Sequence, residues 1–434
     1  MRTQNQNGKV YIVGAGPGDP GLITVKGLDK LKQADVVVYD RLINDDLLSY
    51  CKESSEKIFV GKESGYHPIE QEQITEIMIR KSRLGLTVVR LKGGNPFVFG
   101  RGSEEGIELK GAGIDFEVIP GITSGLSAPI YSGIPITHRG LITQCVLITA
   151  HESPGKQGTQ VEWDKLARLK NATLVIYMGA SRIEGICNEL MECGMDPSTP
   201  SAVIENGTLP KQRTITGRLD RIAQEFKAMD FHAPAIIIIS PTVAMRDQLS
   251  WFENKPVFSK RIVISGDRKQ LEDLREMVYD LGGEVLSLPF SDPTMFQDSP
   301  DGNGHDRNNG RSAERNTLPY GYSYDESNER DFPLMAPKTA FTTVSADSID
   351  DLAEDIRHRG ADAFIFTTSS TVEYFFDIFG YETAVNLLEH GKSIALNRAA
   401  ADTLVSKNVR NINVHTVDSV EGVRDLITNL FSVT

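Results

Sequence analysis

A carboxylate and a lysine follow two apolar segments of the chain, in positions suited to acid–base chemistry. Asp40 comes directly after the apolar residues 36–39, and Lys62 follows Val60 and Gly61. Short apolar segments of this kind indicate buried strands, and open α/β sheets bind ligands at the carboxyl ends of their strands. A carboxylate held there can accept a proton, and an ammonium group can donate one. From the residues alone, however, the commoner roles are a solvated turn carboxylate for Asp40 and an exposed lysine for Lys62.

A loop rich in glycine and proline follows the first apolar segment, residues 10–13. Gly14 and Gly16 begin the spacing of a dinucleotide-binding fingerprint, but its third glycine would fall at position 19, where the chain has Asp19. The spacing therefore argues against a Rossmann NAD site. Pro20 suits the first turn of a helix, so we predict a helix from there with one apolar face. That face comprises Leu22, Val25, Leu28 and Leu31.

The composition is that of a soluble globular protein. The chain has 434 residues, of which 40% are hydrophobic and 24% charged, enough for two or three domains. Its net charge of -13 argues against nucleic-acid binding, and no apolar run is long enough to span a membrane. Without a signal-peptide core at its start, it is expected to be cytoplasmic. The 4 cysteines lack a CxxC spacing, so we expect mostly buried thiols, with no disulfide framework and no metal site.

Strand-like and helix-like segments alternate along most of the chain, which predicts an α/β fold. A largely parallel first lobe over about 8–140 and a second lobe over 141–250 are followed by a small open α/β sheet over 257–290 and 339–434. The intervening residues 291–338 are so polar that we expect a disordered insert or linker. The predicted strands are 10–13, 36–39, 87–91, 116–119, 144–149, 173–178, 201–205, 235–240, 261–265, 284–288, 363–367 and 393–396.

Several motifs occur in order along the first 250 residues. They include Val37-Val-Tyr-Asp-Arg-Leu42, Arg90-Leu-Lys-Gly-Gly-Asn-Pro-Phe-Val-Phe-Gly-Arg101 and Val118-Ile-Pro-Gly-Ile-Thr-Ser124, together with the glycine and proline loop and segments 60–73, 133–139, 177–179 and 205–208. Together they resemble the uroporphyrinogen-III C-methyltransferases of the tetrapyrrole methylase family, over more than half of the chain. The resemblance implies two α/β lobes with a cleft between them, and a homodimer.

The reaction that this resemblance implies is methyl transfer from S-adenosylmethionine to uroporphyrinogen III. The methyl groups go to C2 and then to C7, giving precorrin-2, which leads to sirohaem or cobalamin. Uroporphyrinogen III is then the substrate, and other enzymes of tetrapyrrole synthesis are candidate partners. Because a sulfonium methyl needs in-line approach of the carbon nucleophile, positioning should supply much of the rate.

The resemblance also assigns residues to roles. Asp40 is the implied proton acceptor and Lys62 the proton donor. The implied cofactor pocket comprises Pro17, Gly93, Gly94, Asn95, Val98, Thr123, Ser124, Met178 and Gly207. Implied substrate contacts are Arg41, Tyr66, His67, Arg101 and Arg139, with Lys92 as a further basic candidate.

Three of these residues leave alternatives open. Asn95 departs from the aspartate usual in the family, which predicts weaker cofactor binding because a charge that favours a sulfonium cation is lost. Taken singly, Met178 also fits a core methionine, and His67 also fits a structural loop residue.

The C-terminal segments resemble the uroporphyrinogen-III synthases, but more weakly. The resemblance comes from the β-α-β pattern that opens at Arg261, from 366–372 and from 417–427. That family has two α/β domains with the active site between them, and 291–338 is too short and too polar to form the second one. We therefore expect a truncated synthase-like domain. The alternatives are a bifunctional methyltransferase and synthase, a docking module that is not catalytic, and an N-terminal half that only senses S-adenosylmethionine.

Overall fold

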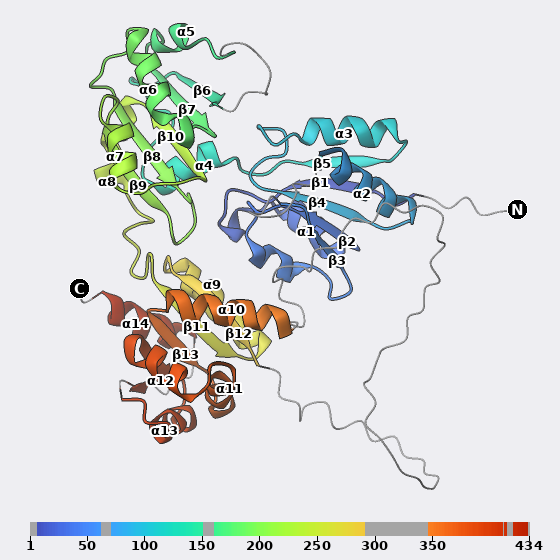
Figure 1. Ribbon diagram of the computed structural model, residues 1–434, viewed down its shortest axis with the longest axis vertical. Coiled ribbons are helices and arrows are strands. Elements are labelled where there is room, and N and C mark those ends of the chain that lie inside the picture. Colours follow the sequence, from blue (N-terminus) through green and yellow to red (C-terminus); the bar gives the residue numbers. More distant parts are fainter. Residues whose placement is uncertain are drawn as a thin grey trace, which may run out of the picture. The chain divides into compact units, whose positions relative to one another are not determined.

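The computed structural model describes residues 7–61, 71–150, 160–290, 346–410, 412–414 and 420–432. These residues form three five-stranded sheets with helices packed against them (Figure 1). The α/β fold class predicted from the sequence is therefore confirmed. The tract 291–338 and the candidate residues Lys62, Tyr66 and His67 lie outside the described residues.

The first sheet is parallel throughout, and its strand order β3-β2-β4-β1-β5 places β4 at the centre. Its strands are β1 Val10–Gly14, β2 Val36–Tyr39, β3 Glu56–Phe59, β4 Val88–Lys92 and β5 Phe116–Ile119. The accompanying helices are α1 Val25–Gln33, α2 Gln71–Arg83, α3 Gly102–Gly111 and the 3-10 helices η1 Pro20–Leu22 and η2 Asp45–Tyr50. Two separate apolar clusters cover its two faces, so β2 and β4 are buried along their whole length.

The segment after β1 differs from the single helix that the apolar spacing predicts. Asp19 accepts a hydrogen bond from the backbone of Gly21 and caps η1, while Thr24 accepts one from Gly27 and caps α1. Two successive capping residues thus divide the segment, and the α-helix begins at Val25. Val25 is 88% exposed, so its place on the buried face was predicted wrongly.

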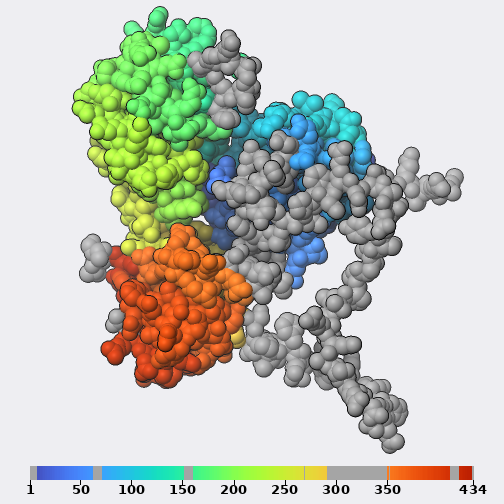
Figure 2. Space-filling model, viewed as in Figure 1, coloured from blue at the N-terminus to red at the C-terminus, as the bar shows by residue number. Residues whose placement is uncertain are grey.

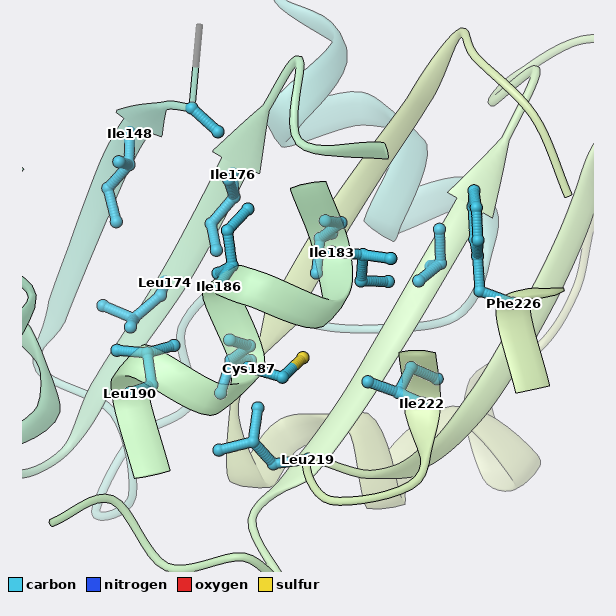
Figure 3. Packing of buried hydrophobic residues seen from close by; sticks show 14 of the residues in the cluster. Ile148, Leu174, Ile176, Ile183, Ile186, Cys187, Leu190, Leu219, Ile222 and Phe226 are labelled. Carbon is cyan, nitrogen blue, oxygen red and sulfur yellow. The ribbon is translucent and has the colours of Figure 1, made fainter. Parts of the chain in front are cut away.

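The second sheet is mixed, with the order β6-β7-β10-β8-β9. Its strands are β6 Gln144–Thr149, β7 Ala172–Tyr177, β8 Pro200–Glu205, β9 Arg213–Arg218 and β10 Ala235–Ile239, and only the β6 and β7 pair is parallel. Its helices are α4 Ser124–Tyr131, α5 Trp163–Ala167, α6 Ile183–Glu192, α7 Ile222–Ala228 and α8 Arg246–Leu249, with η3 Ala180–Arg182 and η4 Pro241–Met245. Figure 3 shows α6 packing Ile183, Ile186 and Leu190 against the strands.

The third sheet is parallel, with the order β12-β11-β13-β14-β15. Its strands are β11 Arg261–Gly266, β12 Glu284–Pro289, β13 Ala363–Phe366, β14 Lys392–Ala395 and β15 Ile412–Val414. Its helices are α9 Arg268–Asp280, α10 Ala346–Arg359, α11 Ser369–Phe379, α12 Tyr381–His390, α13 Arg398–Ser406 and α14 Val420–Phe431. Apolar clusters lie on both faces of the sheet. The described residues from 346 onward form the orange to red part of Figure 2.

The prediction of mostly buried cysteines holds for only two of the four. Cys51 and Cys187 are buried, whereas Cys145 is exposed and Cys193 is half-buried. Burial raises the pKa of the Cys51 and Cys187 thiols to about 11, which keeps them protonated near neutral pH. Within the described ranges, no helix has the length and apolar character needed to cross a membrane.

Candidate active site

A cleft of about 960 Å³ opens at the carboxyl ends of the strands of the first sheet. Pro17, Asp40, Gly93 and Thr123 enter its lining from the loops after four of those strands. Loops of the second sheet add Met178 and Gly207, among others. The volume is near the upper end of the range of about 300–1,000 Å³ that is common for small-molecule sites.

Three glycine-containing loops pack backbone against backbone beside this cleft. They follow β1, β4 and β5, which are neighbours in the sheet. A Cβ on Gly121 would lie 2.2 Å from the carbonyl oxygen of Gly94, and a Cβ on Gly14 would lie 2.5 Å from the nitrogen of Gly121. The Gly94 N–H also donates to the carbonyl of Gly16 at 2.6 Å. Because any side chain would separate these loops, their glycines are required by close approach.

Asp19, which breaks the dinucleotide fingerprint, connects the first of these loops to the elements around it. Its backbone N–H donates to the Thr208 hydroxyl at 3.0 Å, and its Oδ2 accepts from the Tyr131 hydroxyl at 2.7 Å. The Asn44 side-chain amide donates to the neighbouring carbonyl of Gly18 at 2.9 Å. The loop is therefore fixed by hydrogen bonds to residues distant in the sequence.

Tyr177, at the end of β7, fixes the start of α4. Its hydroxyl lies 2.8 Å from the Thr123 hydroxyl and accepts from the Gly125 N–H at 3.0 Å. A Cβ on Gly125 would lie 2.2 Å from that hydroxyl oxygen, so only glycine fits there. Burial raises the pKa of Tyr177 above its usual value, which keeps the phenol protonated.

Met178, and two residues in the loop after β8, have backbone conformations that are unusual for residues with side chains. The φ angles of Met178, Asn206 and Thr208 are 53°, 49° and 72°. Non-glycine residues with positive φ are strained and cluster at functional sites. Met178 is also 47% exposed and lines the cleft, so it is not a core methionine.

Asp40 combines a turn role with a place in the cleft. Its Oδ1 accepts from the Leu42 N–H at 3.1 Å, which is the turn contact that the sequence suggests. Its Oδ2 accepts from Arg90 Nη2 at 3.2 Å, and 26% of its side chain is exposed. The carboxylate is therefore held in place while remaining accessible from the cleft.

Lys92 lies deeper than a carboxylate-binding residue should. Its side chain is 6% exposed and its ammonium donates to Glu105 Oε1 at 2.8 Å. Burial and the nearby Arg90 hold the pKa of Lys92 below its usual value. Glu105 therefore already pairs with the Lys92 ammonium, which the sequence had suggested as a substrate contact.

The cleft brings together most of the predicted site residues. The nine predicted cofactor residues all line it, as do Asp40 and Arg41. Arg101 and Arg139 are exposed and are not among the lining residues. Arg101 precedes α3 and pairs with Glu104 at 2.7 Å on the surface of that helix, which directs its guanidinium to solvent. The described residues hold no cluster of metal-binding side chains.

Sequence reasoning missed Tyr177, Asp19 and Glu105 as residues that build this site. Tyr177 directly precedes Met178 at the end of a predicted strand, so its position was a usable signal. Asp19 and Glu105 make their contacts with residues far along the chain, and no local pattern marks them.

Comparison with known proteins identifies the part of the chain that carries this cleft. The family of tetrapyrrole (corrin/porphyrin) methylases matches residues 9–223. The uroporphyrinogen-III C-methyltransferase of Bacillus subtilis is 42% identical over 284 residues, which are 65% of this chain and 58% of that protein. A siroheme synthase of Escherichia coli O81 is 47% identical over 250 residues, which are 58% of this chain and 53% of that protein. The chain thus spans only slightly more than half the length of these curated relatives.

A solved structure shares the fold. The structure of a cobalt precorrin-4 methyltransferase is 29% identical in sequence to this chain, with a TM-score of 0.50. The match covers 56% of this chain and 99% of that structure's chain. The match of residues 9–223 includes the glycine loops, Asp40 and Met178. Residues 9–223 are therefore a tetrapyrrole methylase domain.

Proposed function

We propose that this chain transfers two methyl groups from S-adenosylmethionine to uroporphyrinogen III, at C2 and then C7, to give precorrin-2. The names of the relatives in B. subtilis and E. coli support this reaction. The observation that carries it is that Asp40 lines the same cleft as the glycine loops, the start of α4 and Met178. A candidate base and a candidate cofactor site thus share one space.

The residues of the cleft fit S-adenosylmethionine. Gly94 has a φ of 68°, and a Cβ there would lie 3.9 Å from the Ser124 nitrogen, so this turn lies close to the N-terminus of α4. Backbone N–H groups at a helix start suit a carboxylate, and the Ser124 hydroxyl suits a ribose. Met178 offers a polarizable thioether for packing against the adenine. When bound, S-adenosylmethionine supplies a methyl group on an electrophilic sulfonium.

The chain's own residues orient the substrate and move the proton. Asp40, held by Leu42 and Arg90, accepts the proton that the tetrapyrrole loses after methylation, which removes the positive charge that the added methyl group leaves on the ring. Arg41 and Lys211 line the cleft and are available to pair with carboxylates of uroporphyrinogen III. Lys62, Tyr66 and His67 keep the roles that the resemblance implies for them.

An Asp40→Asn exchange tests the role of the carboxylate. Asparagine keeps an oxygen for the Leu42 N–H but is not a base, so methyl transfer should fall by about 100- to 10,000-fold. Binding of S-adenosylhomocysteine, measured by calorimetry, should stay unchanged. Asp29→Asn, on the exposed surface of α1, is the matched control and should keep full activity. A fully active Asp40→Asn variant would contradict the base assignment.

We further propose that the protein is a cytoplasmic homodimer. Exposed apolar side chains gather on and beside α4, namely Ile122, Leu126, Ile130 and Trp251, and the Trp251 indole donates to the Ile130 carbonyl at 3.1 Å. Exposed apolar patches of this kind commonly mark interfaces. Light scattering at micromolar concentration should give twice the chain mass, and a monomer would contradict the assembly.

The third sheet leaves two hypotheses for the C-terminal part. As a remnant synthase it would convert hydroxymethylbilane to uroporphyrinogen III, whereas as a docking module it would bind another enzyme of the pathway. Incubating the full chain with hydroxymethylbilane separates them. We expect no uroporphyrinogen III, because residues 291–338, where the second synthase lobe would be inserted, are too few and too polar to form it.

A further inference from the structure

A buried cluster of charged side chains lies beside the cleft, and methyl transfer as derived above uses only the contact of Arg90 with Asp40. Arg90 and Lys92 are two residues apart on β4, so they extend from the same face of the sheet. They meet Glu105 of α3 there, and Gln71 at the start of α2. Exposure is 3% for Arg90, 6% for Lys92 and 0% for Glu105. Burying such charges is costly, and apolar residues would fill the same space at least as well.

The Glu105 carboxylate is the centre of this cluster. Its Oε1 accepts hydrogen bonds from Gln71 Nε2 at 2.7 Å, Lys92 Nζ at 2.8 Å and Arg90 Nε at 3.2 Å. Its Oε2 is buried and has no partner among the described residues. Unpaired buried polar atoms are uncommon in folded proteins, so the Glu105 carboxylate needs an explanation beyond packing.

Arg90 connects Glu105 to Asp40. Its Nε faces Glu105, Nη1 donates to the carbonyls of Val38 and Leu91 at 3.3 and 3.1 Å, and Nη2 donates to Asp40 Oδ2 at 3.2 Å. The guanidinium is planar and rigid, so fixing its Nε edge also fixes the direction of Nη2. Glu105 thereby acts on Asp40 without touching it.

The sequence around Glu105 brings α3 close enough for these contacts. A Cβ on Gly102 would lie 2.7 Å from the Pro96 carbonyl, so the helix starts directly against the turn that follows β4. A Cβ on Gly106 would lie 3.1 Å from the Phe116 ring, so the helix also packs tightly on β5. Glu105 follows within the first turn of this helix and points into the sheet.

We propose that Glu105 is a positioning residue for methyl transfer, whose buried carboxylate anchors Arg90 and through it holds Asp40 at the edge of the cleft. This inference rests on the proposed role of Asp40 as the base. Among the described residues, the charged groups paired within the cluster are Arg90 and Lys92 from β4 and Asp40 from the end of β2, while the Arg101 and Glu104 pair lies on the exposed side of α3.

A Glu105→Gln exchange in the full chain tests the proposal. Glutamine preserves the shape but weakens the anchor for Arg90, and small misplacements of a catalytic group cost about 10- to 100-fold in rate. We expect kcat to fall in that range, with the KM for uroporphyrinogen III and the affinity for S-adenosylhomocysteine both within about twofold of their original values. Glu104→Gln, one residue away on the exposed face of α3, is the control and should leave kcat unchanged. An unchanged kcat in Glu105→Gln would overturn the proposal.

A second exchange separates positioning from simple neutralisation of Lys92. The Lys92→Met exchange removes the ammonium group. Glutamine at position 105 then leaves no buried lysine without a partner, so the double variant is expected to fold. Positioning through Arg90 predicts that Glu105→Gln lowers kcat by the same factor in this background. If Glu105 only neutralises Lys92, the exchange has no effect there, and the proposal is wrong.

A crystal structure of the Glu105→Gln variant gives a readout that does not depend on the substrate. Arg90 should have moved, so that its hydrogen bond to Asp40 is broken. An unmoved Arg90 would refute the positioning role even if the enzyme methylates uroporphyrinogen III. A moved Arg90 in a chain whose original form methylates nothing would instead count against the proposed function alone.

Discussion

At the scale of single residues, the polar groups of the cleft are held by contacts that the motifs do not announce. The Asn95 side chain donates to the Gly121 carbonyl at 3.0 Å and accepts from the Phe97 N–H at 2.9 Å. It thus joins the loops after β4 and β5. Asn95 thus keeps the acceptor role expected from the sequence and adds a donor contact that the sequence did not indicate.

Asn95→Asp should separate these two roles. An aspartate cannot donate to Gly121, so stability should fall by about 1–3 kcal/mol in urea unfolding. The added charge should attract the sulfonium, raising affinity for S-adenosylmethionine relative to the uncharged S-adenosylhomocysteine by at least about fivefold. Calorimetry with both compounds measures this ratio, and an unchanged ratio would show that Asn95 does not face the sulfonium.

Tyr177→Phe should reveal the contribution of the phenol that joins β7 to α4. Near pH 8 the variant should be less stable by about 1–3 kcal/mol, because the Thr123 hydroxyl and Gly125 N–H lose their partner. Burial in the folded state raises the pKa of Tyr177 above the usual tyrosine value of about 10, so the unfolded chain releases this proton first. The stabilisation is therefore complete below about pH 10 and lost as the pH rises further. Urea midpoints of both chains should converge above pH 10, and a constant gap would contradict this.

The sequence anticipated the composition of the site better than its geometry. Motif residues such as Gly94 and Met178 line the cleft because they follow strand ends, a position that apolar runs reveal. Arg101 and Arg139 are charged residues in the same motifs, yet they point to solvent. Sequence order does not tell which side of a loop a side chain takes, nor does it reveal contacts such as that of Glu105 with β4.

At the scale of elements, every central strand was predicted, but only three of the six edge strands were, namely β5, β6 and β12. Predicted segments 36–39, 144–149 and 235–240 agree with β2, β6 and β10 to within one residue. The three strands that were missed, β3, β9 and β15, each lie at the edge of a sheet. The sequences of β3, Glu-Lys-Ile-Phe, and β9, Arg-Thr-Ile-Thr-Gly-Arg, lack the continuous apolar runs by which buried strands are recognised.

Gly121→Ala tests the close packing of the loops after β1, β4 and β5. The added Cβ would lie 2.2 Å from the Gly94 carbonyl oxygen, so these loops must move apart. Overpacking of this kind costs about 1–3 kcal/mol, and cofactor affinity should fall because Gly94 shifts. Gly111→Ala at the end of α3, where nothing lies within 4 Å of the new Cβ, is the control. Thermal unfolding and S-adenosylhomocysteine binding measure both, and equal behaviour of the two variants would contradict the packing argument.

At the scale of the whole molecule, loops from a parallel sheet and from a mixed sheet line one cleft. The parallel first sheet contributes the loops at its carboxyl ends, and the mixed second sheet contributes Met178 and Gly207. The division into 8–250 and a C-terminal domain over 257–290 and 339–434 stays a prediction, although each sheet falls within one of these parts. The mixed pairing of the second sheet was not foreseen, because strand direction depends on connections that span tens of residues.

The most direct test of the account is to count the methyl groups transferred by the full chain. Purified protein is incubated without oxygen with uroporphyrinogen III and S-adenosylmethionine carrying a labelled methyl group, and the product is followed by absorbance and mass. The account predicts a product with two labelled methyl groups, formed through a singly methylated intermediate. No labelled tetrapyrrole, despite measurable binding of S-adenosylmethionine, would contradict the proposed catalysis and leave cofactor sensing as the function of the cleft.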